Sequence, residues 1–484
     1  MKINWRKYNY FGRRQFIGHG GYGEVFKVAY PLIAVSASYI VMTFADRLLL
    51  AHARTDFVAA ALPVGTMYFT LFCFFSVTAN FTSALVAQFF GAGKRGECIY
   101  AAWNGFYFAL AASVLIMVLN PVLGKLIIDH SGIRPELIAP ANDYLRGLWL
   151  SGVFTTLAMP LWSFYSGRGI TWPVAVVSIG SCLLNIVLDY MLIFGRWGAP
   201  CWGIYGGGIA TTIAGGFGFI CALFFFLFAN QRNYPTRKLR RFKFDYIKKI
   251  VGYGTPAGVQ VFLEVGSFSF MTFLVGGMSR DYLAATTIAL SVNNFSFSPL
   301  MGLSDATAIV VGQYIGRGRT AIAERVTYRA WRMSLFYMVL CSIVYLTCPE
   351  FLANLFAPDE SGGFDFQAVV DITAKILVCA AVFNMFDAVK YIFMGGLRGA
   401  GDTRVIFLYT SGMQWLVMIP GLIWLIRYAG ADIMTIWIFL TCCFGIEGIL
   451  ITLRFRSGKW KRIKLINRAP DAAVAVPGAG GVQD

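Results

Sequence analysis

The sequence predicts an all-α polytopic membrane protein, with twelve transmembrane helices in two parallel six-helix repeats around a central cavity. Of its 484 residues, 57% are hydrophobic and 13% are charged, whereas charged residues make up about a quarter of an ordinary soluble protein. An outer-membrane barrel would show alternating segments of about ten residues, and the sequence contains no such pattern. The spans are therefore helical, because hydrocarbon offers no partner to an unpaired backbone group.

Apolar runs along the chain are long enough for a helix of about 20 residues to cross the bilayer. They predict twelve spans, at residues 28–52, 59–90, 99–128, 141–166, 171–195, 203–229, 248–277, 282–314, 325–349, 368–396, 405–428 and 432–454. An even number of spans places both ends of the chain on one side of the membrane.

The net charge of +17 would suggest nucleic acid as a partner if the protein were soluble. The basic residues instead gather in alternate connections between the spans, while the intervening connections carry few of them and more acidic residues. By the positive-inside rule, this pattern predicts a multi-pass protein of the cell (inner) membrane with both termini cytoplasmic. Its expected partner is the lipid bilayer and not nucleic acid, and no oligomer is required.

The most basic polar interruption divides the chain into two halves. The predicted organisation is a cytoplasmic basic arm (1–27), an N-lobe with spans one to six (28–229), a cytoplasmic linker (230–249), a C-lobe with spans seven to twelve (250–456) and a cytoplasmic tail (457–484). The composition of the tail, rich in Ala, Gly and Val, predicts disorder.

Two patterns resemble chemical sites, but neither predicts an enzyme or a cofactor. Residues 18–25 fit the glycine-rich loop of protein kinases, yet no H-R-D or D-F-G motif follows. The ten cysteines show no metal or disulfide spacing, so we interpret them as small apolar packing residues.

The two halves repeat each other. V-A-Q-F-F-G-A-G-K at residues 86–94 matches V-G-Q-Y-I-G-R-G-R at 311–319, and Pro31 pairs with Pro256 at the same offset. The corner at 167–171 likewise matches the corner at 399–403, which we interpret as a tight turn rather than a phosphate loop because no strand precedes it. All matched pairs lie on the cytoplasmic side, which indicates parallel repeats.

Carboxylates inside apolar spans are costly, so each requires a reason. The clearest cases are Asp46, Asp189, Glu264 and Asp387, whereas Asp305, Asp371 and Glu447 are explained as well by solvation or structural pairs.

Asn185 and Asp189 are four residues apart and so lie on one helix face. They can share a sodium ion, relay a proton, or simply join helices by hydrogen bonds. Glu264 has no neighbouring base in its own helix, so it must find a partner elsewhere, bind a cation, or remain protonated.

Several segments together resemble the multidrug and toxic compound extrusion (MATE) family. They are L-R-G-A-G-D-T (397–403), V-G-Q-Y-I-G-R-G-R (311–319), N-I-V-L-D-Y-M-L-I-F-G-R-W-G-A-P (185–200) with G-I-A-T (208–211), and F-L-E-V (262–265). The resemblance runs from about residue 26 to residue 454 and implies a two-lobed, cation-coupled antiporter that expels organic cations. It implies an ion-coupling role for Glu264 and Asp387 in the second lobe, and for Asp46, with Asn185, Asp189 and Thr211, in the first.

The sequence departs from the family at Lys390, one turn after Asp387, where the family usually has a neutral residue. A lysine there can neutralise the acid internally. This shifts the expected sodium site to Asp46, Asn185 and Asp189, or favours protons as the coupling ion.

The leading hypothesis is an antiporter that exchanges Na⁺ or H⁺ for small organic cations or drugs by alternating access. The alternative is a flippase for a lipid-linked or polyanionic substrate, which would require a cavity rich in Arg and Lys. A signalling protein with kinase-like activity would rest only on residues 18–25.

Overall fold

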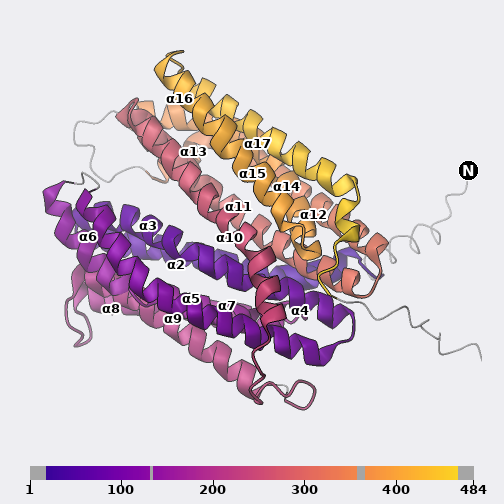
Figure 1. The fold of residues 1–484 in the computed structure, drawn as a ribbon. Helices are drawn as coiled ribbons and strands as arrows, with labels where there is room; N and C mark the ends of the chain where they lie inside the picture. The colour runs from indigo at the N-terminus through magenta and orange to yellow at the C-terminus, as the bar shows by residue number, and fades with distance from the viewer. Residues whose placement is uncertain (1–17, 131–133, 230, 357–365, 467–484) are drawn as a thin grey trace, which may run out of the picture.

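The computed structural model describes residues 18–130, 134–229, 231–356 and 366–466. These residues form helices, with no strand among them. Figure 1 shows two helical lobes, an N-lobe of α2 to α9 and a C-lobe of α10 to α17, one above the other. The predicted all-α, two-lobed architecture is confirmed.

The N-lobe contains the six spans of the first half. Its helices are α2 (Tyr22–Ala53), α3 (Thr55–Asn80), α4 (Thr82–Gly91), α5 (Arg95–His130), α6 (Pro135–Leu148), α7 (Ser151–Ser166), α8 (Trp172–Phe194) and α9 (Gly203–Phe228).

The C-lobe repeats this plan. Its helices are α10 (Phe244–Gly276), α11 (Arg280–Gly316), α12 (Thr320–Thr347), α13 (Pro349–Asn354), α14 (Phe366–Ala400), α15 (Thr403–Gly412), the π-helix η1 (Met413–Met418), α16 (Ile419–Arg427), α17 (Ile433–Arg456) and the 3₁₀-helix η2 (Lys459–Arg462).

Within the described residues, eleven helical segments are long and apolar enough to cross a membrane. The predicted span missing from these eleven is the fourth, at residues 141–166, which corresponds to α6 and α7 with a turn at residues 149 and 150 between them. Several helices extend past their predicted ends. The first begins at Tyr22 rather than residue 28, and the tenth continues to Ala400 rather than residue 396.

Equivalent hydrogen bonds support the parallel repeat. In the N-lobe the Thr171 hydroxyl donates to the carbonyl of Val28 at 3.2 Å. In the C-lobe the Thr403 hydroxyl donates to the carbonyl of Tyr253 at 2.6 Å. Each threonine is the last residue of one of the two matched corners and binds the first helix of its own lobe. The repeated sequence therefore makes the same contact in both lobes.

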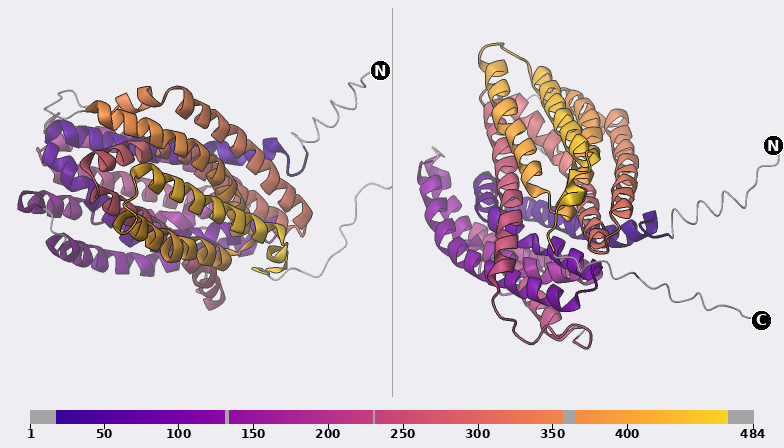
Figure 2. Two further views of the ribbon diagram at one scale, coloured as in Figure 1. Left: turned by 90° about the horizontal axis from the view of Figure 1, so that it is seen from above. Right: turned by 45° about the vertical axis from the view of Figure 1, so that its right-hand side comes forward.

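The lobes meet along α2 with α11, α3 with α10, and α4 with α11. The long helix α10 lies at this seam, in contact with α3 and α5 of one lobe and α15 of the other, and can be followed in both views of Figure 2. We call the end of the bundle that carries Lys94, Arg319 and Arg398 the basic end. In Figure 1 the lobes meet at the side where the described chain begins and ends, and their helices diverge towards the other side.

The kinase-like glycines occupy a packing position. Within the described part of residues 18–25 there is no strand, and α2 already begins at Tyr22. Gly20 has φ +69°, and a Cβ there would lie 2.7 Å from Ile322 of α12. Its N–H donates to the Tyr314 hydroxyl at 2.8 Å. Glycine thus lets the start of α2 pack closely against the C-lobe.

The chain reverses within the predicted corner at 399–403, at Gly401, whose φ is +91°. Helix α14 continues to Ala400, so Gly395 and Gly399 lie in the helix rather than in the turn. Gly395 and Gly399 are needed for contact instead, because a Cβ on either would lie within 2.5 Å of a backbone oxygen of α11.

The described start of the predicted tail, residues 457–466, is packed against the protein. Trp460 stacks on Phe455 at 5.0 Å, and Leu465 and Ile466 are buried among N-lobe side chains such as Phe89. The chain therefore crosses from the C-lobe to the N-lobe at the basic end. Residues 467–484, and residues 1–17 of the predicted arm, lie outside the described part.

Candidate functional site

The four residues predicted in the first lobe come together from three helices. Asp46 lies on α2, Asn185 and Asp189 on α8, and Thr211 on α9. With its nitrogen facing the carboxyls, the Asn185 amide donates to Asp46 Oδ1 at 2.7 Å and to Asp189 Oδ2 at 3.3 Å, while its oxygen accepts from Thr211 N at 3.3 Å. We assign this orientation because it satisfies both ends of the amide. We call these residues the N-lobe cluster.

The Asn185 amide nitrogen thus holds one carboxyl oxygen of Asp46 and one of Asp189 close to each other. Asn185 and Asp189 are fully buried, and Asp189 Oδ1 has no hydrogen-bond partner among the described residues. Two carboxyls in contact can form a hydrogen bond only if one of them carries a proton. The geometry of the N-lobe cluster therefore fits a shared proton.

A sodium ion would need a different arrangement of the same residues. Hard cations prefer oxygen ligands, but the Asn185 amide presents its nitrogen to the carboxyls and its oxygen to a backbone N–H. No group of three or more His, Cys, Asp or Glu side chains able to hold a metal occurs in the described parts of the chain. Binding of Na⁺ would therefore require the Asn185 amide to turn its oxygen towards the carboxyls.

The second-lobe residues form a charged cluster around a buried lysine. Lys390 of α14 is fully buried, and its Nζ lies 3.2 Å from Glu264 Oε1 of α10 and 2.6 Å from Glu447 Oε2 of α17. Tyr391 donates to Glu264 Oε1 at 2.7 Å, and Gln260 donates to Glu264 Oε2 at 2.9 Å. We call these five residues, together with Asp387, the C-lobe cluster.

Lys390 pairs with different acids from the one expected. The sequence places it one turn after Asp387 and predicts that it neutralises that residue, but its ion pairs in the described structure go to Glu264 and Glu447. Asp387 is buried, and its Oδ1 has no hydrogen-bond partner within the described residues. Side chains of a helix lean towards its N-terminus, but the opposing carboxylates on α10 and α17 decide where the ammonium lies.

The weaker candidates differ in their surroundings. Asp305 pairs with Arg398 at 3.6 Å, and Asp371 is exposed and accepts from Gln367 at 3.1 Å. Both fit the structural explanation given by the sequence.

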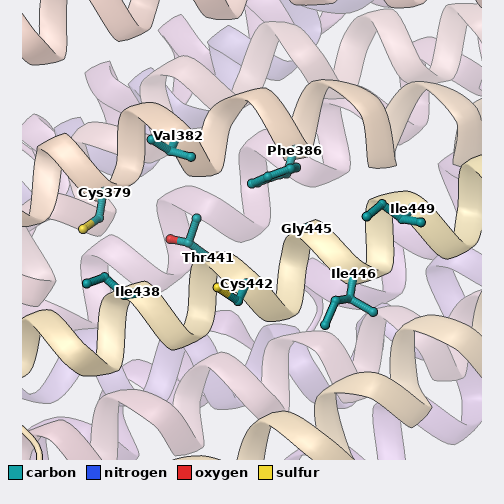
Figure 3. A pocket seen from close by; sticks show the side chains of 9 residues that line it. All are labelled: Cys379, Val382, Phe386, Ile438, Thr441, Cys442, Gly445, Ile446 and Ile449. Atoms are coloured by element: carbon teal, nitrogen blue, oxygen red, sulfur yellow. The ribbon is translucent and has the colours of Figure 1, made fainter.

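A hollow of about 550 Å³ lies between α14 and α17 (Figure 3). Its lining residues are Cys379, Val382, Phe386, Ile438, Thr441, Cys442, Gly445, Ile446 and Ile449. None is charged, and four of the aliphatic ones are exposed on the outside of the lobe. None of the predicted ion-coupling residues lines it. The cysteines here, like the other eight, form no disulfide.

The family model described as MatE matches residues 31–191 and 256–423, which are well over half of the chain. The chain belongs to the MATE family. Its two matched segments coincide with most of the two lobes, and they include every member of the N-lobe cluster except Thr211 and every member of the C-lobe cluster except Glu447.

Curated relatives in the MATE family carry names that refer to drug resistance. A probable multidrug resistance protein NorM of Bradyrhizobium diazoefficiens is 30% identical over 440 residues, covering 90% of this chain and 92% of the relative. Multidrug resistance protein PmpM of Pseudomonas aeruginosa is 30% identical over 407 residues, covering 82% of each. These similarities support a multi-pass membrane transporter of the drug-extrusion type.

Solved structures show the same fold. One, described as the outward-facing conformation of a multidrug resistance MATE family transporter, matches with a TM-score of 0.81 over 90% of this chain and 96% of that structure's chain, at 16% identity. At this identity the match establishes the MATE fold alone.

Three members of the C-lobe cluster cannot be identified from the sequence alone. The Glu447 carboxylate is explained there equally well by a structural pair, and Tyr391 and Gln260 do not differ from other polar side chains in apolar spans. One signal was present for Glu447, because it lies between Gly445 and Gly448 in an otherwise apolar span. Gly445 lets α17 lie close to α14, since a Cβ there would be 3.3 Å from the Phe386 ring.

Proposed function

We propose that this MATE family transporter is a proton-coupled antiporter that expels small organic cations by alternating access. The observation that carries the proposal is the Asn185 amide, which donates to the carboxyls of both Asp46 and Asp189. Asp189 is fully buried and Asp46 is half-buried, and two neighbouring carboxyls in such a site disfavour each other's ionisation unless a counter-charge is present. The N-lobe cluster therefore either holds a proton or requires a cation.

The coupling follows from this requirement. Protonation lets α2 and α8 close around the shared proton, and loss of the proton leaves two negative charges that repel each other or attract a cationic substrate. A coupling ion shifts the equilibrium between lobe arrangements only as far as its affinities for them differ. A site whose two acids touch in one arrangement and separate in the other supplies that difference.

The C-lobe cluster supports protons rather than sodium as the coupling ion. The Lys390 ammonium occupies the position between Glu264 and Glu447 where a free monovalent cation would otherwise bind. Because it is covalently attached, it competes with Na⁺ at any Na⁺ concentration. The same pairing argues against the flippase alternative, since the buried lysine already has two carboxylate partners and is not available to a polyanion.

We further propose that the protein lies in the inner membrane with its basic end in the cytoplasm. This end carries Lys94, Arg319 and Arg398, and excess positive charge marks the cytoplasmic side of membrane proteins. The proposed lobe boundaries remain residues 28–229 and 250–456, joined by the linker at 230–249.

Transport in everted membrane vesicles tests this function. A pH gradient and a Na⁺ gradient are imposed separately, and uptake of a panel of cationic dyes is followed. We expect uptake with the pH gradient alone, and its collapse when the proton gradient is dissipated. Uptake that follows only the Na⁺ gradient would refute proton coupling, and lipid translocation without dye uptake would refute drug export.

A further inference from the structure

Two hydrogen bonds that mirror each other join the lobes at the basic end. Gln88 of α4 donates from Nε2 to the carbonyl of Gly399 in α14 at 3.0 Å. Gln313 of α11 donates from Nε2 to the carbonyl of Gly167, at the end of α7, at 2.9 Å. Gln88 and Gln313 hold the same position in the two nine-residue repeats, and Gly167 and Gly399 open the two matched corners. The pseudo-twofold relation between the lobes thus exchanges one bond with the other.

Both bonds supply a donor to a backbone carbonyl at the C-terminal end of a helix. Gly167 follows the last residue of α7, and Gly399 is next to the last residue of α14. The final carbonyls of a helix have no partner within it. Gln88 and Gln313 are buried and supply these partners from the opposite lobe. Separation of the lobes would leave two amides and two carbonyls without partners until water reached them.

Glycines in the same repeats bring the backbones of the two lobes into contact. A Cβ on Gly91 would lie 2.0 Å from the Gln313 carbonyl oxygen, and a Cβ on Gly316 would lie 2.0 Å from the Gln88 carbonyl oxygen. Only glycine permits so close an approach. Each glutamine therefore binds the opposite lobe through its side chain and contacts a glycine of that lobe through its backbone.

We propose that Gln88, Gln313, Gly91 and Gly316 form a reciprocal latch that holds the basic end closed and sets the equilibrium between the two lobe arrangements. The glutamines are positioning residues for transport, because they lie outside both ion-coupling clusters. The inference rests on the alternating-access transport proposed above. Two hydrogen bonds of ordinary net strength suit such a latch, because they bias the equilibrium and can still be broken in each cycle.

Distance measurements between spin labels on the two lobes test the latch directly. Suitable sites are Gly96 in the first turn of α5 and Ala321 in the first turn of α12, which hold equivalent positions in the two halves. Space around Gly96 is open, and Ala321 is exposed. Both are changed to cysteine and labelled after the exposed native cysteines, Cys201, Cys348 and Cys442, are replaced by serine.

In the Gln88→Ala/Gln313→Ala variant, we expect the population with a long distance between the labels to rise roughly tenfold relative to the population with a short distance, because two hydrogen bonds are lost. Each single variant should change this population ratio by about the square root of that factor, because the two bonds are equivalent. Gln88→Glu keeps the size of the side chain but loses the N–H donor, so it opens the basic end as well. An unchanged distance distribution in the double variant would overturn the proposal.

Gln231→Ala is the matched control. This glutamine also donates to a carbonyl near the basic end, but its bonds to Phe226 and Thr236 stay within the N-lobe and the linker. We expect no change in the distances between the lobes. An equal shift in this variant would show that any lost glutamine loosens the protein, and would also refute the latch.

Gly91→Ala provides a second test that keeps both glutamines. Its new methyl group would clash with the Gln313 backbone oxygen, so the long-distance population should again increase. Closed lobes in this variant would contradict the latch even if the double glutamine variant failed to fold. The variants are compared at one fixed pH and Na⁺ concentration, so the change in distance that each substitution causes can be measured whichever ion drives transport. A vesicle assay that refuted proton coupling would therefore leave the latch result valid, and a refuted latch would leave the vesicle result valid.

Discussion

Lys390 Nζ lies 2.6 Å from Glu447 Oε2, and this ion pair joins α14 to α17 in the interior of the C-lobe. The same ammonium lies 3.2 Å from Glu264 on α10 and 4.5 Å from the centre of the Phe444 ring. Three helices are thus held around one buried cation. The desolvation of such a group is tolerated only where carboxylates and ring faces surround it.

Replacement of Lys390 by methionine should destabilise the fold and create a response to sodium. Removal of one partner from a buried ion pair costs about 3 to 5 kcal/mol, so the melting temperature in detergent should fall. Glu264 and Glu447 are then free to hold another cation, and added Na⁺ should raise the melting temperature of the variant, since a bound ligand stabilises the folded state.

Lys375→Met serves as the control for this experiment, because Lys375 lies on the same helix but is exposed. Neither the control nor the wild-type protein should respond to Na⁺. A variant that melts at a lower temperature but shows no response to Na⁺ would contradict the view that Lys390 occupies a cation position.

Much of the fold can be predicted from the sequence, because membrane spans depend on a local property. Each span needs its own continuous apolar run, and the repeated motifs fix the parallel relation of the halves before any contact is known. Helix ends are less predictable. The tenth helix continues through Gly395, Gly396 and Gly399, since packing against α11 and α12 outweighs the low helix propensity of glycine.

The candidate site could be predicted only in part, for a physical reason. Asn185 and Asp189 share a helix face, so their proximity follows from helix geometry. The partners of Lys390 do not, because Glu264 and Glu447 are far from it in the sequence and their positions depend on how α10, α14 and α17 pack. Local spacing therefore suggested Asp387 as the partner, and tertiary contacts provide two others.

Glu264 and Asp387 should differ in their effects on stability, although both are buried acids of one cluster. Glu264 accepts from Lys390, Tyr391 and Gln260, so Glu264→Gln should lower the free energy of unfolding by about 1.5 to 3 kcal/mol. Asp387→Asn removes a carboxyl with an unpartnered oxygen and should change it by less than about 1 kcal/mol. Unfolding in a denaturing detergent measures both values, and equal losses would contradict the described contacts.

The start of α17 should depend on pH through Asp432. Hydrogen bonds from the Thr435 hydroxyl at 2.6 Å and from its N–H at 3.1 Å lower the pKa of the exposed Asp432 carboxyl. A group whose pKa is lowered by folding stabilises the folded state above its unfolded pKa, about 3.9 for Asp, and this contribution disappears as the pH falls through the lowered value.

Asp432→Ala removes this helix cap, which is worth about 0.5 to 2 kcal/mol. Faster amide hydrogen exchange in the first turn of α17 would show the loss. Asp432→Asn keeps a capping oxygen but does not titrate, so its exchange rates should lack the pH dependence attributed to Asp432. The same pH dependence in this variant would assign the effect to another group.

Asp46 and Asp189 should contribute to transport as one unit, because the Asn185 amide donates to both carboxyls. Either Asp46→Asn or Asp189→Asn leaves one carboxyl facing an amide, a pair that no longer needs to share a proton. Dye uptake driven by a pH gradient should therefore fall by about 10- to 100-fold in each variant, the usual range of a coupling free energy. The double variant should fall little further, since the two acids act as one site. Asp56→Asn is the control, because the Asp56 side chain is 47% exposed and its ion pair among the described residues is with Arg54, at 3.3 Å. Additive losses in the double variant would show that the two acids bind protons independently, and unchanged uptake in both single variants would remove the N-lobe cluster from the coupling mechanism.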